Sequence, residues 1–183
     1  MHPHIAAVTS RLATARASLR DAVDAVPPAA RSARPHPDRW SVNEVLEHLS
    51  IVEALFTKRI GDAIARARED GLGEETGERV PLPEDIERLV ADRVNRRTAP
   101  EPARPTGRFG ADAAWVAVER SRDGLVATLT SVDGAALSRV VSSHPAFGAL
   151  NVYQFTELIA AHEVRHARQI MEISEMLQAG AGQ

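Results

Sequence analysis

Four long stretches of the chain carry apolar side chains at spacings of three and four residues, the period of one face of an α-helix. These stretches cover residues 3–26, 42–69, 111–131 and 151–178. The pair Pro27–Pro28 ends the first, and Gly71 and Gly73 end the second, because proline and glycine interrupt helices. No segment alternates apolar and polar residues convincingly, and Val140–Val141 is too short to count as a strand. The pattern predicts an all-α fold, a four-helix bundle, in one domain over residues 1–183.

A long connection separates the second and third long helices of this prediction. Residues 71–110 contain five of the 11 glycines and five of the 11 prolines, so most of the stretch is expected to be a surface loop. A short helix is predicted inside it from four apolar residues, Ile86, Leu89, Val90 and Val94. A connection of this length inside a small domain is unusual and often borders a functional site.

The composition limits the chemistry that the chain offers. It has no cysteine, which excludes disulfides, cysteine nucleophiles and cysteine-based zinc sites. The 22 Lys and Arg against 25 Asp and Glu give a net charge of −3, so we expect no nucleic-acid partner. The arginines of the first helix and the pair Arg96–Arg97 are interpreted as solvated charges. No stretch reaches the ~18 apolar residues of a membrane span, and the N-terminus lacks a signal-peptide pattern, so we expect a cytoplasmic protein that does not associate with membranes.

Two histidines, His162 and His166, lie one helical turn apart in the last predicted helix. Both belong to its apolar stripe, which consists of Val152, Phe155, Ile159, His162, His166, Ile170, Ile173 and Leu177. Two imidazoles in an apolar interior are costly unless they are paired or bind a metal. Two interpretations of the pair therefore have equal weight. The histidines bind a metal, or they are structural residues that lie at the edge of the surface or are bonded to the backbone. Residues 162–166 also satisfy the H-E-x-x-H motif of zinc proteases, but no third ligand follows at a suitable distance and no sheet is predicted to hold a peptide.

A third histidine, His48, borders the inward face of the second predicted helix, between Val45 and Val52. Alone it is best interpreted as a core histidine, but with His162 and His166 it offers three imidazole ligands from two helices. Three protein ligands leave a coordination position open, as in catalytic rather than structural metal sites. The other histidines are expected to be exposed and structural; they are His2, His4, His36 and His144.

Two segments of the chain resemble signatures of the DinB/YfiT-like superfamily. Residues 40–49, Trp-Ser-Val-Asn-Glu-Val-Leu-Glu-His-Leu, are similar to the signature of its second helix. His-Pro-Ala-Phe-Gly at residues 144–148, followed by His162, His166 and the pair Gln169–Ile170, is similar to its C-terminal signature. The resemblance implies a four-helix bundle, frequent homodimers, and a divalent metal, usually zinc or nickel, on the three histidines named above.

Members of that superfamily resemble metal-dependent hydrolases, or enzymes that use a low-molecular-weight thiol as S-transferases or as a maleylpyruvate isomerase. The expected function is therefore thiol transfer to an electrophilic small molecule, or hydrolysis of a small substrate, at a metal centre that activates a bound thiol or water. The thiol would be external, because the chain has no cysteine. Glu47 and Glu163 adjoin ligands and are candidates for a general base or an outer partner of a ligand, but are interpreted first as solvated surface charges. The alternative is a non-catalytic, stress-related bundle that binds a metal or another ligand.

Overall fold

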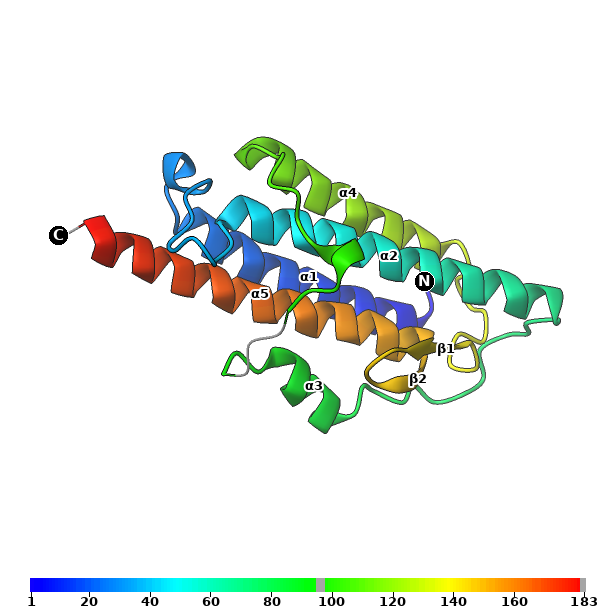
Figure 1. The fold of residues 1–183 in the computed structure, drawn as a ribbon. Coiled ribbons are helices and arrows are strands. Elements are labelled where there is room, and N and C mark those ends of the chain that lie inside the picture. The colour runs from blue at the N-terminus through cyan, green and yellow to red at the C-terminus, as the bar shows by residue number, and fades with distance from the viewer. Residues whose placement is uncertain (95–97, 182–183) are drawn as a thin grey trace.

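Four long helices run alongside one another and form the body of the molecule (Figure 1). The structure is a computed structural model that describes residues 1–94 and 98–181. The long helices are α1 (Pro3–Asp24), α2 (Val42–Glu69), α4 (Ala111–Thr130) and α5 (Val152–Ala181). Helix α1 packs against α5, α2 packs against α4, and α2 also contacts α5. The predicted all-α bundle is confirmed, and the predicted helix ends lie within a few residues of the observed ones.

The start of α2 is fixed by a capping box. The Ser41 Oγ accepts a hydrogen bond from the Glu44 backbone N–H at 3.3 Å, and the Glu44 carboxylate accepts one from the Ser41 N–H at 2.8 Å. Every residue from Val42 to Ser50 is buried, so the first turns of α2 are covered on all sides rather than along one stripe. His48 lies in this covered stretch.

A β-hairpin precedes α5, which corrects the expectation that the chain contains no strand. Strand β1 (Val141–His144) pairs antiparallel with β2 (Gly148–Asn151), and Val141 lies opposite Asn151. Gly148 adopts a φ of +71°, which glycine reaches without strain. Strands of four residues are too short to produce a detectable alternation, so only their pairing reveals them. The described residues form no sheet larger than this two-stranded one.

Two short elements of the connection between α2 and α4 contact the bundle. Helix α3 (Glu84–Ala91) packs on α5, and a 3₁₀ turn, η2 (Glu101–Ala103), contacts α2. The short helix predicted here is confirmed, but Val94 lies beyond its end and is 89% exposed. Arg96–Arg97, interpreted as solvated, lie outside the described residues. No helix in the described part of the chain has the length and apolar character needed to cross a bilayer.

The buried apolar side chains form two clusters along the bundle. On each long helix a charged residue intervenes where one cluster gives way to the other. These residues are Arg16 on α1, Glu53 on α2, Arg122 on α4 and Glu163 on α5. The middle of the bundle therefore contains a polar layer between two apolar ones, and the histidine cluster lies beside that layer.

Candidate metal centre

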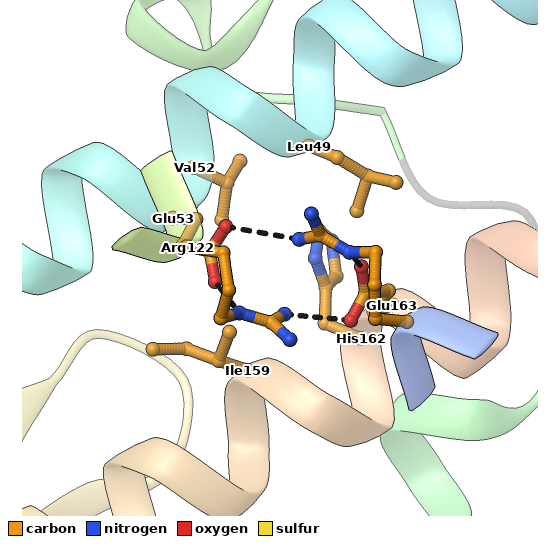
Figure 2. Close-up of a pocket in the computed structure, with 8 residues that line it drawn as sticks. Leu49, Val52, Glu53, Arg122, Ile159, His162 and Glu163 are labelled. Carbon is orange, nitrogen blue, oxygen red and sulfur yellow. Dashed lines mark hydrogen bonds and ion pairs between the residues drawn. The ribbon is translucent and has the colours of Figure 1, made fainter. Parts of the chain in front are cut away.

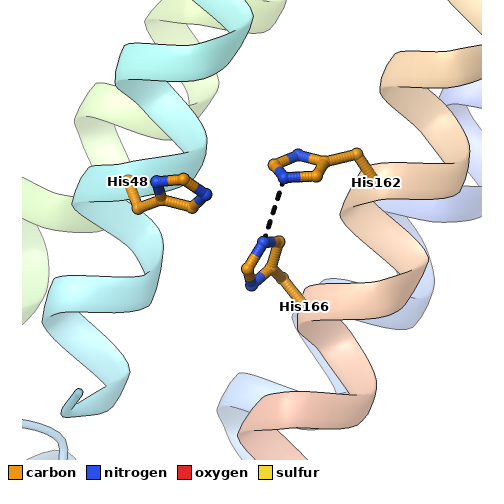
Figure 3. Close-up of side chains that lie close together, drawn as sticks. All are labelled: His48, His162 and His166. Carbon is orange, nitrogen blue, oxygen red and sulfur yellow. Dashed lines mark hydrogen bonds between the residues drawn. The ribbon is translucent and has the colours of Figure 1, made fainter. Parts of the chain in front are cut away.

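The fold brings together the three histidines that the sequence singled out. His48 comes from α2, and His162 and His166 come from successive turns of α5, so that the three rings point toward one another across the helix interface (Figure 3). One ring nitrogen from each lies within 4.8 Å of the others. The Nε2 atoms of His162 and His166 are 3.1 Å apart. His48 and His166 are buried and His162 is half-buried, so the described residues form a three-histidine cluster that could hold a metal ion.

Hydrogen bonds on the outer side of the cluster fix which ring nitrogens face inward. The Nδ1 of His48 lies 2.6 Å from the Ala103 carbonyl oxygen, which can only accept, so Nδ1 carries the proton. The Nδ1 of His166 lies 2.8 Å from Oε1 of Gln169, an oxygen that also accepts from Arg93. Both histidines therefore keep Nε2 as an unprotonated nitrogen, which is the arrangement found where histidine ligates a metal.

Burial keeps these imidazoles neutral. Burial lowers the pKa of His48, and the hydrogen bond to the Ala103 carbonyl opposes that effect only in part. Burial, together with the neighbouring rings of His162 and His48, lowers the pKa of His166 well below its ordinary value. Because a metal binds the neutral imidazole, no proton has to leave either ring at neutral pH.

Glu163 is buried in a network of charges, and its interpretation as a solvated surface charge is wrong. Its carboxylate accepts from Arg16 Nε at 2.5 Å and from Arg122 Nη2 at 2.6 Å. Arg122 also donates through Nε to Glu53 at 2.6 Å (Figure 2). Arg16 Nη2 lies 3.4 Å from the same glutamate. Each long helix thus contributes one member to a ring of two arginines and two glutamates. Arg16 is therefore not a solvated charge of the first helix either.

Glu47 is also buried, with 1% of its surface exposed, which again corrects the first interpretation. Its carboxylate accepts from the Thr106 hydroxyl at 2.6 Å and from the Gly107 N–H at 2.9 Å. Both glutamates beside the histidines therefore have their oxygens engaged by other protein groups. The arrangement favours a role in holding structure around the cluster over a role as general base.

A small cavity lies between the charged ring and the cluster. Its volume is about 10 Å³, enough for roughly one water molecule. The lining residues are Arg16, Leu49, Val52, Glu53, Arg122, Ile159, His162 and Glu163. On this side His162 faces a space for about one water molecule that is lined by both charged and apolar side chains (Figure 2).

No motif in the sequence predicted the charged ring, although the position of Arg122 indicated a buried charge. Arg122 lies four residues after Val118 and three before Leu125, on the apolar stripe of α4. A charge at such a position predicts a buried partner. The partner itself could not be identified, since Glu53 and Glu163 lie far from Arg122 in the sequence.

The other four histidines are not part of the cluster, and of these four only His36 is exposed. His2, His4 and His144 are half-buried, so the expectation that they are exposed is wrong for these three. His144 stacks on Phe147 with ring centroids 4.8 Å apart and also packs near Phe56. Burial, and then the charge of Arg59, lowers the pKa of His144.

The family sequence model of the DinB superfamily matches residues 11–170 of this chain. The matched range includes all three histidines of the cluster and at least part of every long helix. The chain belongs to the DinB superfamily. The resemblance noted in two sequence segments is therefore confirmed over most of the chain. The match also includes the first helix from Arg11 onward, which the sequence segments did not cover.

This DinB superfamily chain is also similar to one named protein and to one solved structure. It is 28% identical over 149 residues to the uncharacterized protein YuaE of Bacillus subtilis (strain 168), a match that covers 79% of this chain and 83% of YuaE. Its structure is similar to the crystal structure of TT2238, a four-helix bundle protein, with a TM-score of 0.55 and 19% identity. That similarity covers 96% of this chain and 98% of the other, and it shows a shared fold.

Proposed function

We propose that this chain is a metal-dependent enzyme in which His48, His162 and His166 hold one divalent ion, zinc or nickel. The observation that carries the proposal is the convergence of three imidazoles within 4.8 Å. Two of them have a defined tautomer that leaves Nε2 unprotonated. An imidazole donor set suits zinc, nickel, copper or iron better than magnesium or calcium.

The proposed reaction is transfer of an external low-molecular-weight thiol to an electrophilic small molecule, or hydrolysis of a small substrate. His48, His162 and His166 would hold the ion, which would supply a lowered pKa for a thiol or water brought to it. The chain supplies neutral ligands only, so the cluster leaves the positive charge of the ion uncompensated. It has no thiol of its own, and Glu47 and Glu163 are engaged elsewhere, so the residues bind and orient rather than attack.

A second candidate is a non-catalytic bundle that holds the metal without turnover. The small cavity of about 10 Å³ beside His162 favours it, because a substrate needs more room than one water molecule. In either case we propose a small-molecule ligand and a homodimer, the latter from the family resemblance.

Metal analysis of the untagged protein tests the proposal. Wild type is expected to contain about one zinc or nickel ion per chain, and His48→Ala and His162→Ala are expected to lose it. His36→Ala changes an exposed loop histidine and is expected to retain the full metal content. Wild-type protein without a transition metal, or alanine variants with full metal, would overturn both candidates.

Turnover separates the two candidates. The metal-loaded protein is incubated with a low-molecular-weight thiol and an aryl halide or epoxide, and separately with a small activated ester. Turnover that disappears in His162→Ala supports the enzyme. Full metal occupancy without turnover on these substrates supports the non-catalytic bundle.

A further inference from the structure

A segment of the α2–α4 connection, residues 103–107, lies against the outer side of the histidine cluster. Ala103 is the last residue of η2, and its carbonyl accepts from His48 rather than continuing a helix. Thr106 and Gly107, a few residues further on, donate to Glu47. The connection therefore touches two consecutive residues of α2, the histidine and the glutamate before it.

Two further hydrogen bonds attach this segment to α2, and both are made to Glu47. Both oxygens of the buried carboxylate are used, one by the Thr106 hydroxyl and the other by the Gly107 N–H. Gly107 has a φ of +71°, a conformation that glycine adopts at little cost and that turns its N–H toward the carboxylate. A buried carboxylate is costly without such donors. Glu47 therefore needs the donors of the segment, and the segment is held against α2 by Glu47.

We propose that Glu47 is a positioning residue for His48. By holding Thr106 and Gly107 it keeps the Ala103 carbonyl on Nδ1 of His48, and so fixes Nε2 as the nitrogen that faces His162 and His166. Without this attachment, the Ala103 carbonyl leaves Nδ1 and His48 populates both neutral tautomers, one of which presents a proton to the cluster. The metal-binding part of this inference rests on the proposed function, whereas the tautomer part concerns the protein alone.

The chain offers a variant pair that separates this role from general stability. Thr106 is exposed, so Thr106→Val removes one donor to Glu47 without opening the core, and valine keeps the shape of threonine. Thr106→Ser keeps the hydroxyl and is the matched control. Glu47→Gln removes the charge and leaves one oxygen to accept from two donors, and it is expected to show the larger effect.

The first measurement is the tautomer of His48 in metal-free protein, from two-bond ¹⁵N–¹H NMR spectra of the imidazole nitrogens. Wild type and Thr106→Ser are expected to show only the Nδ1-protonated form of His48. Thr106→Val and Glu47→Gln are expected to show a mixture, with far-UV circular dichroism unchanged. A purely structural glutamate would lower stability without changing the tautomer, and that result would overturn the proposal.

The second measurement is zinc affinity by competition with a chelator. Thr106→Val and Glu47→Gln are expected to bind zinc about 10- to 100-fold more weakly, the range typical of losing an outer partner of a histidine ligand. Thr106→Ser is expected to match wild type. If wild type binds zinc and Glu47→Gln binds it equally well, the inference fails and the proposed function stands. If wild type binds no transition metal, the proposed function fails, and the NMR result alone decides the role of Glu47.

Discussion

Glu163, the residue that follows His162 on α5, accepts a hydrogen bond from Arg122 on α4 at 2.6 Å across the bundle. The contact connects the polar layer to the histidine cluster through adjacent residues of one helix. Desolvation lowers the pKa of the Arg122 guanidinium, but the charges of Glu163 and Glu53 outweigh it and raise the pKa overall. The two glutamates therefore stabilise the charged form of the arginine.

Removing Arg122 is expected to destabilise the fold strongly. Arg122→Met leaves two buried carboxylates short of a partner, and breaking a buried ion pair in this way costs about 3–5 kcal/mol. Lys58→Met is the control, because Lys58 forms an exposed pair with Asp62 and its loss is expected to change little. Urea unfolding of both variants gives the comparison, and equal midpoints would show that the ring contributes no more than a surface pair.

Zinc affinity is expected to depend on pH in a defined range. The ligands bind as neutral imidazoles, and the pKa values of His48 and His166 lie below the ordinary value of about 6.5. At these two rings, protons therefore compete with the metal only below about pH 6.5. Metal-free protein is titrated with Co²⁺ in place of zinc, and the visible absorption of the bound ion reports the affinity. The affinity is expected to be constant from pH 8 to 7 and to fall at lower pH. A marked loss already above pH 7 would contradict this assignment.

The metal-free protein is expected to lose stability as the solution is acidified. His166 has a lowered pKa in the folded state, so below its ordinary pKa of about 6.5 the unfolded chain binds a proton that the folded chain does not. Its contribution is therefore fully present above that pH and is lost as the pH falls toward the folded-state pKa. The slope is at most about 1.4 kcal/mol per pH unit for each such histidine.

The variant His166→Gln isolates this effect. Chelator-treated wild type and variant are unfolded with urea at pH 7 and pH 5.5. The variant is expected to lose less stability between the two, while His48 still contributes to the remaining loss. His36→Gln is expected to behave like wild type, and an unchanged slope in His166→Gln would contradict the prediction.

Two glycines are expected to respond oppositely to alanine. Gly124 lies inside α4 on its exposed side, and a Cβ there would meet no atom within 4 Å, so Gly124→Ala is expected to stabilise the protein by about 1 kcal/mol. Gly134 has a φ of +83°, which alanine adopts only with strain, so Gly134→Ala is expected to destabilise it by about 1 kcal/mol. Thermal unfolding of the two variants measures both signs, and shifts in the same direction would contradict the prediction.

The helices and two of the three cluster histidines follow from the sequence alone. Apolar residues at spacings of three and four determine which face of a helix is buried, and this is a local property of the chain. His162 and His166 occupy one such stripe, so their common orientation follows from helix geometry. His48 could be placed on an inward face, but its distance from the pair depends on how α2 and α5 align along the bundle.

Packing decided the remaining features, because each depends on groups that are distant in the sequence. Glu47 and Glu163 look like solvated charges until Thr106, Gly107, Arg16 and Arg122 are brought to them. A carboxylate can be buried only where donors compensate for its lost hydration, and local periodicity carries no information on those donors. The sequence thus determined the helices and their inward-facing imidazoles, whereas the tertiary structure decided which charges are buried and which ring nitrogen His48 presents.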